Sequence, residues 1–233
     1  MTNIALILAA GKGTRFESPF PKQLVPLNGK AILTYSLDIV ENMSDLDMTM
    51  LVIDLLHKRL FREIADKYKK RIEMCPGGST RQQSVYNGLK YIKKIIPQTD
   101  TINVLIHDSA RPFATTVFKN VLSMLKKEEA VVPVIKPKDT NYLIEDQKIV
   151  NIPCREHLFH VQTPQGFSFP TIFDCHKLTA EKQMNTFTDD GSLYYKLKGK
   201  SPTVVDGDQM NFKITNKKDL MLAAYYLSKE KTS

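Results

Sequence analysis

The sequence of 233 residues is poor in cysteine and glycine, has only 12 prolines and contains no long apolar run. Its 3 cysteines, an odd number without C-x-x-C spacing, indicate neither a disulfide framework nor a thiolate metal cluster, so we expect a reducing, cytoplasmic location. With 10 glycines and 12 prolines, the chain is unlike collagen or low-complexity sequence. The apolar run 4–10 follows no basic segment and is far shorter than the roughly 20 residues of a membrane-spanning helix, so we expect no signal peptide and no membrane partner.

The chain has 33 basic and 25 acidic residues, which gives a formal net charge of +8. This excess favours anionic partners, although it does not distinguish a nucleotide from a nucleic acid or a phosphorylated metabolite. The basic residues are not interleaved with aromatic residues that could stack on bases, so we expect no nucleic-acid partner. Basic runs such as 67–71 are typical of solvated helix ends.

Apolar residues fall along the chain into short strand-like runs and longer helix-spaced segments. The runs predict strands at 3–9, 48–54, 71–75, 102–107, 130–135 and 203–206. The spaced segments predict helices at 31–40, 57–68, 80–94, 115–126, 170–182, 189–197 and 217–227. Alternating strands and helices with short connections are the pattern of a doubly wound, mostly parallel α/β sheet. Residues 1–233 show no repeat and no linker, so we expect a single domain.

Residues 136–151 break this alternation. Two short β-prone pieces, 141–144 and 148–152, flank the polar turn 145–147, which predicts a hairpin protruding from the sheet. An isolated hairpin is only marginally stable in water. We therefore expect this arm, at about 137–157, to pack on its own domain or on a second subunit.

The predicted fold also indicates where a ligand would bind. Ligands of parallel α/β sheets bind outside the carboxyl ends of the strands. The loops after Ala9, Cys75 and His107 follow such ends. We therefore expect these three loops, which carry glycine or aspartate, to meet at one edge of the sheet.

The first of these loops reads LAAGKGTRF over residues 8–16, followed by PKQ at 21–23. Gly11 and Gly13 let backbone N–H groups approach a phosphate, and Arg15 and Lys22 add positive charge. A dinucleotide fingerprint would need a third glycine at Phe16, and the spacing of a P-loop is absent. From the residues alone, the segment is either a phosphate-binding loop of another kind or a tight turn with basic surface residues.

Five segments together are similar to a known family. They are residues 8–16 with 21–23, GGSTRQQSVYNGL at 77–89, HDSARPF at 107–113, QTPQ at 162–165 and NFKIT at 211–215. In this order, over nearly the whole chain, they resemble the 2-C-methyl-D-erythritol 4-phosphate cytidylyltransferases. The resemblance implies a Rossmann-like nucleotidyltransferase fold and a reaction in which a polyol phosphate attacks the α-phosphorus of CTP and pyrophosphate leaves. It also implies Mg²⁺ or another divalent cation as cofactor, and a homodimer formed through the arm.

The resemblance assigns roles to single residues as well. Arg15, Lys22 and Lys213 would be catalytic, in line with the need of nucleotidyl transfer for positive charge at the reacting phosphates. Asp108 would hold the metal. The residues that would bind the nucleotide are Ala9, Ala10, Gly11, Gly13, Arg15, Lys22, Gly77, Gly78, Arg81, Ser84, Asp108 and Ser109. Those that would bind the acceptor are Asp108, Arg111, Thr140, Arg155, Thr163 and Lys213, with Thr140 and Arg155 reaching partly across the dimer interface.

Ordinary structural roles are an alternative for several of these residues. Asp108 follows a strand, where aspartate is a common turn residue. Ser79 or Thr80 would serve as the N-cap of a helix. His107 is interpreted as a packed strand-end residue, because an ionised acceptor phosphate needs no base. The other histidines show no spacing typical of metal ligands.

Two features depart from the family pattern. Met210 stands where many members carry an acidic residue, and Asp206 or Asp208 would have to replace it. The segment IPCR at 152–155 is closer to the ribitol 5-phosphate cytidylyltransferases of surface-polymer pathways. We predict an enzyme of isoprenoid precursor synthesis that makes 4-diphosphocytidyl-2-C-methyl-D-erythritol. The alternatives are a D-ribitol-5-phosphate cytidylyltransferase making CDP-ribitol and a catalytically silent homologue that binds CTP.

Overall fold

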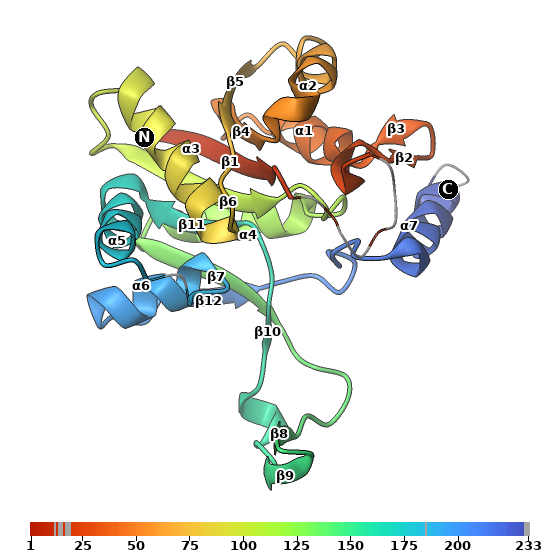
Figure 1. The fold of residues 1–233 in the computed structure, drawn as a ribbon, viewed down its shortest axis with the longest axis vertical. Helices are drawn as coiled ribbons and strands as arrows, with labels where there is room; N and C mark the ends of the chain where they lie inside the picture. Colours follow the sequence, from red (N-terminus) through yellow and green to blue (C-terminus); the bar gives the residue numbers. More distant parts are fainter. Residues whose placement is uncertain (12, 14–15, 17–19, 185, 231–233) are drawn as a thin grey trace.

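The computed structural model describes residues 1–11, 13, 16, 20–184 and 186–230. Its centre is a sheet with the strand order β10-β7-β11-β6-β1-β4-β5, and a further strand, β12, pairs with β7 (Figure 1). The strands are β1 (Thr2–Ala9), β4 (Met48–Ile53), β5 (Arg71–Pro76), β6 (Ile102–Asp108), β7 (Ala130–Ile135), β10 (His160–Val161), β11 (Gln165–Ser168) and β12 (Thr203–Asp206). Strand β1 pairs in parallel with β4 and β6, β4 with β5, and β7 with β12. The predicted α/β class with a mostly parallel sheet is confirmed.

Helices cover both faces of the sheet (Figure 1). They are α1 (Ile32–Asn42), α2 (Lys58–Ala65), α3 (Arg81–Ile95), α4 (Thr115–Leu125), α5 (Phe169–Glu181), α6 (Asp190–Lys198) and α7 (Lys217–Glu230). Side chains of β1 alternate between two cores: Ile4 and Leu6 pack with α3, α5 and α6, whereas Ala5 and Ile7 pack with α1, α2 and α4. In the described part of the chain, no helix combines the length and the apolar character needed to cross a bilayer.

Strand β11 enters the sheet antiparallel between β6 and β7, and the sequence did not predict it. It has only four residues, without an apolar alternation, and one of them is Gly166. A Cβ atom at Gly166 would lie 2.5 Å from Cγ1 of Val121, because helix α4 packs directly on the strand backbone. Glycine at this position therefore allows close packing of helix α4. The reason for the glycine lies in a distant segment, so the local sequence does not predict the strand.

Smaller elements complete the structure. The short hairpin of β2 (Pro26–Leu27) and β3 (Lys30–Ala31) and helix α7 share a third apolar cluster, which includes Leu27 and Ala223. The described residues include the 3₁₀ turns η2 (Lys22–Leu24), η3 (Leu55–His57) and η4 (Arg155–His157). The helix predicted at 57–68 is shorter than expected, since η3 precedes α2 and α2 ends at Ala65.

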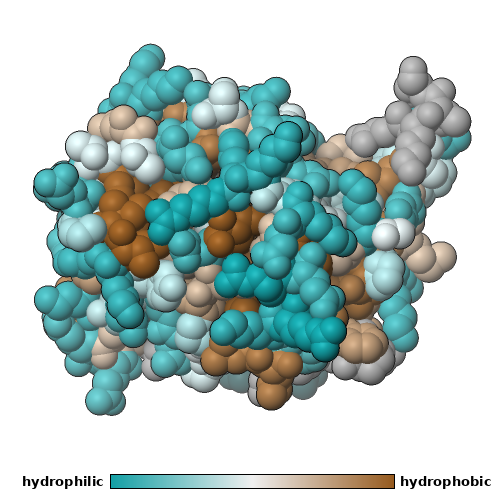
Figure 2. Space-filling model, turned by 90° about the horizontal axis from the view of Figure 1, so that it is seen from above, coloured by the Kyte–Doolittle hydropathy of each residue, from teal (hydrophilic) through white to brown (hydrophobic). Residues whose placement is uncertain are grey.

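The predicted hairpin is formed by β8 (Leu143–Glu145) and β9 (Lys148–Asn151), and it lies at the far end of the molecule from β4 and β5 (Figure 1). Both turn residues, Asp146 and Gln147, have positive φ, which matches the twist of two-residue hairpin turns. Apolar side chains on the arm between Tyr142 and Ile152 are 49–59% exposed. On the face of the body shown in Figure 2, by contrast, brown apolar groups are separated by teal hydrophilic ones.

Lys70 departs from the expectation that the basic run 67–71 is only a solvated helix end. Its ammonium donates hydrogen bonds to the backbone oxygens of Val40, Met43 and Leu46, which follow or end helix α1. The last carbonyls of a helix have no partner within the helix. A single partly buried ammonium therefore supplies hydrogen bonds to three backbone oxygens at the end of α1, before the chain enters β4.

We predict that Lys70→Met lowers the free energy of unfolding by about 1–3 kcal/mol, because three backbone oxygens lose their donor. Chemical denaturation monitored by circular dichroism measures this loss. Lys69→Met is the matched control. It removes the same charge from the adjacent residue, and Lys69 is exposed. The control is expected to stay within about 0.5 kcal/mol of the wild type. Equal effects of the two substitutions would contradict the role given to Lys70.

Candidate active site

A cavity of about 500 Å³ opens beside the carboxyl ends of β1 and β6 and the start of α3. Its volume lies within the range typical of small-molecule sites. The lining residues are Leu8, Ala10, Gly11, Gly13, Lys22, Gln23, Gly78, Ser79, Thr80, Arg81, Ser84, Asp108, Ser109, Ala110, Lys213 and Thr215. The expectation that three loops meet at one edge of the sheet is confirmed, and the segment 211–215 joins them.

The first loop is fixed by a side chain that the sequence analysis did not single out. Gln23 is buried, and its amide donates to the backbone oxygen of Ala9 and, at 3.2 Å, to that of Gly11. Gly13 has a φ of +60°, and a Cβ atom there would lie 2.9 Å from Cβ of Lys22. The loop therefore needs glycine at position 13 for both conformation and space. Arg15 lies outside the described residues.

Lys22 connects this loop to the far end of the sequence. It lies in the turn η2, and its Nζ donates to the backbone oxygen of Ile214 at 2.6 Å. Ile214 in turn donates its backbone N–H to the oxygen of Ala110 in the loop after β6. The segment that carries Lys213 is thereby held against the first and third loops.

The second loop approaches the first very closely. A Cβ atom at Gly77 would lie 2.2 Å from Cβ of Ala10, so only glycine fits there. The backbone N–H of Gly78 donates to Oγ of Ser84 at 3.0 Å. Thr80, rather than Ser79, is the N-cap of α3, because its Oγ1 accepts from the backbone of Gln83. The structural role and a nucleotide-binding role of this segment are compatible.

Asp108 is the centre of a cluster of cations. Nζ of Lys213 is 2.7 Å from Oδ2, Nε of Arg81 is 3.3 Å from Oδ1, and Nε of Arg111 is 4.0 Å from Oδ2. Burial favours the neutral acid, but the charges of Arg81 and Lys213 outweigh it and hold the pKa of Asp108 well below its ordinary value. One carboxylate thus faces three cations, and the cavity keeps a positive excess suited to an anionic ligand.

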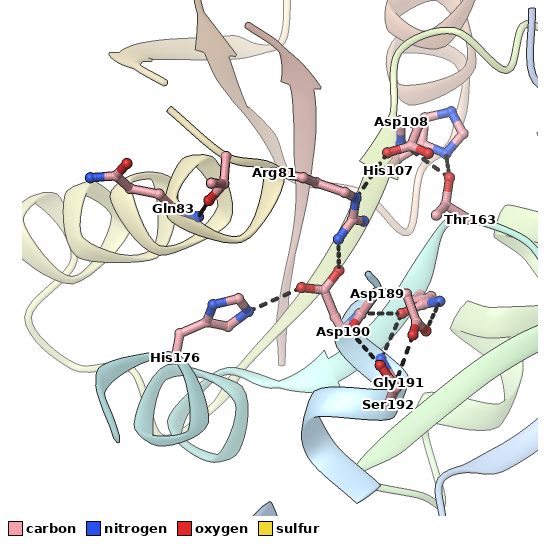
Figure 3. A network of polar contacts seen from close by, with 12 residues as sticks. Arg81, Gln83, His107, Asp108, Thr163, His176, Asp189, Asp190, Gly191 and Ser192 are labelled. Carbon is pink, nitrogen blue, oxygen red and sulfur yellow. Dashed lines mark hydrogen bonds and ion pairs between the residues drawn. The ribbon is translucent and has the colours of Figure 1, made fainter. Parts of the chain in front are cut away.

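Thr163 lies behind Asp108 and does not line the cavity. Its Oγ1 accepts a hydrogen bond from the backbone N–H of Asp108 at 3.1 Å and is 3.2 Å from Nδ1 of His107 (Figure 3). Complete burial lowers the pKa of His107 to about 3, so this ring is neutral at physiological pH. Arg111 is also directed away from the cavity lining, because its Nη1 donates to the backbone oxygen of Asn211 at 2.7 Å.

Two of the residues predicted to bind the acceptor are on the arm. Thr140 and Arg155 are exposed, and neither lines the cavity of the same chain. The segment of η4 that carries Arg155 also brings Cys154, Glu156 and His157 together, with potential ligand atoms within 4.8 Å of one another. This grouping was not predicted, because its members are nearly adjacent in the sequence and do not have the wider spacing of known metal motifs.

Met210 left open whether Asp206 or Asp208 supplies a second acid near the proposed metal position. Oδ1 of Asp208 accepts a hydrogen bond from the backbone N–H of Met210 at 2.8 Å, and Asp206 is exposed at the end of β12. Neither lines the cavity. Among the described lining residues, Asp108 is the only carboxylate. One carboxylate together with substrate phosphate oxygens is a donor set that suits Mg²⁺.

A buried acid on α6 belongs to the same polar network and was missed from the sequence. Oδ2 of Asp190 is 2.8 Å from Nη1 of Arg81, and the two residues are 109 positions apart. Figure 3 shows Arg81 between Asp108 and Asp190. The one signal in the sequence is the pair Asp189-Asp190 at the start of a helix, where a single acid is enough to cap the backbone.

Comparison with known proteins gives one consistent family. The family model described as "IspD: 2-C-methyl-D-erythritol 4-phosphate cytidylyltransferase" matches residues 3–229. The curated proteins of that name from Thermosipho melanesiensis and Clostridium botulinum strain 657 are 36% identical over 224 residues and 38% identical over 232 residues. These alignments cover 94% and 97% of this chain and 95% and 98% of the relatives.

Solved structures agree with the sequence relatives. A crystal structure of 4-diphosphocytidyl-2C-methyl-D-erythritol synthase from Anaerococcus prevotii is similar with a TM-score of 0.83 and 31% identity, covering 97% of this chain and 98% of that one. The cytidylyltransferase from Thermus thermophilus has a TM-score of 0.76 and 29% identity, with 97% and 98% coverage. The chain therefore belongs to the 2-C-methyl-D-erythritol 4-phosphate cytidylyltransferase family and is a nucleotidyltransferase.

Proposed function

We propose that the cavity binds CTP and transfers its cytidylyl group to 2-C-methyl-D-erythritol 4-phosphate. An oxygen of the acceptor phosphate attacks the α-phosphorus, the bond to the bridging oxygen of the β-phosphate breaks, and pyrophosphate leaves. The product is 4-diphosphocytidyl-2-C-methyl-D-erythritol, a precursor in isoprenoid synthesis. The observation that carries this proposal is the convergence of Lys213 and Arg81 on Asp108 beside a glycine-containing loop that also carries Lys22.

Each part of the cavity has a place in this reaction. The backbone of Gly11 and Gly13 and the ammonium of Lys22 would hold the triphosphate, with Arg15 from the same loop. Lys213 would neutralise charge that develops on the reacting phosphates. Neutral His107 has no role as a base, because the attacking phosphate oxygen is already ionised.

The nucleotide-binding set extends over both neighbouring loops. Ser84 and Gly78 form one wall of the cavity, and Ser109 forms part of another. Ala9 and Gly77 do not line the cavity themselves, but they set the close approach of the two loops. We propose that these small residues leave room for the pyrimidine ring against the backbone.

The proposed reaction uses a divalent cation, and Mg²⁺ fits the residues present. Asp108 would hold the ion together with phosphate oxygens of the nucleotide, and the bound ion would neutralise charge on those oxygens. Nζ of Lys213 donates to Oδ2 of Asp108 at 2.7 Å. With Asp108 holding a cation, the ammonium of Lys213 would be able to donate to phosphate oxygens instead.

The family relationship favours methylerythritol phosphate as the acceptor over ribitol 5-phosphate. Arg111 and Thr163 both contact Asp108, but neither lines the cavity, so Asp108 and Lys213 are the proposed acceptor residues that an acceptor in this cavity would meet directly. The segment 152–155 on the arm is the feature that keeps ribitol 5-phosphate as the second candidate. Both acceptors are small polyol phosphates that the same cations could hold.

We also propose a homodimer formed through the arm. The hairpin exposes apolar side chains, among them Tyr142, Ile144 and Ile149, and an isolated hairpin of this kind is only marginally stable. A second copy of the chain would cover this surface and receive Thr140 and Arg155 in its own cavity. A cytoplasmic location and the single-domain organisation stay predictions from the sequence.

The first prediction concerns the acceptor. With CTP and Mg²⁺, we expect pyrophosphate release with methylerythritol 4-phosphate at a kcat/KM at least about 100-fold above that with ribitol 5-phosphate, since the two acceptors differ in chain length and branching, and a small misplacement of the attacking phosphate costs about 100-fold in rate. Chelation of the metal is expected to abolish release, and UTP and ATP serve as nucleotide controls. Preference for ribitol 5-phosphate would replace the proposed acceptor, and silence with both would support the CTP-binding homologue.

The second prediction concerns the first loop. Lys22→Ala is expected to lower kcat by about 100-fold or more, because a cation that contacts the transferred phosphates is lost. The fold is expected to persist, with a change in melting temperature of a few degrees from the lost hydrogen bond to Ile214. Lys30→Ala is the matched control, since Lys30 is an exposed lysine paired with Asp38 on the surface. Full activity of Lys22→Ala would remove Lys22 from the catalytic set.

The third prediction tests the arm by complementation. Lys22→Ala and Arg155→Ala are each expected to be inactive, whereas a refolded equal mixture should regain about a quarter of wild-type activity, because half of the dimers then contain one intact site. A mixture of Lys22→Ala with the double variant contains no intact site and serves as the control. No recovery in a mixture shown to contain hybrid dimers would contradict a site shared between subunits.

A further inference from the structure

Arg81 has three nitrogen atoms in different surroundings (Figure 3). Nε is 3.3 Å from Oδ1 of Asp108, and Nη1 is 2.8 Å from Oδ2 of Asp190. Nη2 is buried and has no hydrogen-bond partner within the described part of the chain. Arg81 lines the cavity, so a ligand there would lie beside this guanidinium, and Nη2 is the nitrogen that still lacks an acceptor among the described residues. An arginine that is held at two nitrogens can offer the third in a fixed direction.

Asp190 lies behind Arg81 and is only 1% exposed. Its Oδ1 is 3.0 Å from Nε2 of His176, and its backbone N–H donates to Oε1 of Gln165 at 3.1 Å. It does not cap helix α6, because Asp189 accepts the capping hydrogen bond from Ser192. Burial opposes ionisation of Asp190, but the charge of Arg81 and the hydrogen bond from His176 outweigh it, and its pKa lies below the ordinary value.

His176 fixes Asp190 from the other side. It is 1% exposed on helix α5, and its ring stacks at 9° on the ring of Tyr86 from helix α3. An ionised carboxylate only accepts hydrogen bonds, so Nε2 of His176 carries the hydrogen that Asp190 receives. Figure 3 shows His176, Asp190, Arg81 and Asp108 joined in this order by dashed contacts, and they connect α5 with the end of β6.

A buried ion pair contributes little to stability compared with apolar residues of the same volume, and it is best explained where it fixes a geometry. Arg81 could meet Asp108 without Asp190, but its guanidinium would then have one anchor and could rotate. Two carboxylates at different nitrogens define the plane of the guanidinium. The pairing with Asp190 therefore fixes where Nη2 points.

We propose that Asp190 is a positioning residue for nucleotide binding. Supported by His176, it orients Arg81 so that Nη2 donates to an oxygen of the bound cytidine nucleotide while Nε holds Asp108. The inference rests on the proposed binding of CTP in this cavity. The group on the nucleotide is an anionic phosphate oxygen or a carbonyl oxygen of the base, both of which accept from a guanidinium.

The test is Asp190→Asn, which keeps the size of the side chain and removes its charge. An amide cannot accept from both Arg81 and His176, since one of its two polar atoms is a donor. We expect the KM for CTP to rise and kcat/KM for CTP to fall by about 10–100-fold, as is typical when a residue supporting a ligand-binding group is altered. The KM for the acceptor at saturating CTP is expected to change little. Calorimetric titration of CTP with Mg²⁺ should show the same weakening.

Two further comparisons separate positioning from a structural role. Asp189→Asn removes a charge from the adjacent residue and is expected to leave the KM for CTP within about twofold of the wild type, because Asp189 does not contact Arg81. His176→Gln retains an N–H donor toward Asp190, whereas His176→Leu does not. We expect His176→Gln to keep most of the CTP affinity. His176→Leu is expected to weaken CTP binding as much as Asp190→Asn does.

The outcomes are distinct. A folded Asp190→Asn enzyme with wild-type affinity for CTP would overturn the inference while leaving the proposed function intact. If Asp190→Asn does not fold, the two His176 variants decide, and equal CTP affinity of His176→Gln and His176→Leu would overturn the inference. If the wild-type protein neither binds nor uses CTP, the proposed function falls and the positioning role falls with it.

Discussion

Strand β1 is paired along both edges and covered on both faces, and the geometry of the site depends on this constraint. Its partners β4 and β6 run in the same direction, so the chain leaves all three strands at one edge of the sheet. The glycine-containing loop after Ala9 and the loop at Asp108 are therefore neighbours in space. The backbone N–H and the hydroxyl of Ser109 both donate to the oxygen of Leu8, which joins the two loops directly. The cavity exists because parallel pairing places these ends together.

The charges around Asp108 determine which kind of ligand the cavity can bind. A lone buried aspartate would favour the neutral acid, because burying an unpaired charge costs free energy. The same holds for the charge of a lone buried lysine or arginine. Asp108 and its neighbours Arg81, Lys213 and Arg111 offset one another, and the excess of cations leaves the site prepared for a phosphate chain. Asp190 extends this balance into the core, where its own charge is satisfied by Arg81 and His176.

The parts of this structure that could be predicted from the sequence have local signals. The buried run of β1, the glycines after it, and Asp108 at the end of another buried run all stand next to the residues that explain them. Strand β11 and the bond between Arg81 and Asp190 have no such signal, since each joins segments that are far apart in the chain. The role of Lys70 was not predicted for the same reason, because its three acceptors lie at and just after the end of α1, 24 to 30 residues earlier in the chain. The proposed reach of Arg155 into a cavity has no local signal either, because it would depend on a second copy of the chain.

Lys22 and Lys213, the two lysines of the site, donate to acceptors of different kinds. Lys22 donates to a neutral backbone oxygen, whereas Lys213 is bound to the carboxylate of Asp108. A phosphate oxygen is a stronger acceptor than a backbone carbonyl, so a nucleotide can compete for the hydrogen bond that Lys22 donates to Ile214. Lys213 gains little by such an exchange unless another cation takes its place at Asp108. In the proposed reaction, Lys213 would therefore donate to the nucleotide only where Asp108 also holds the metal. A cytidine triphosphate without a divalent ion would then bind weakly and remain unreactive.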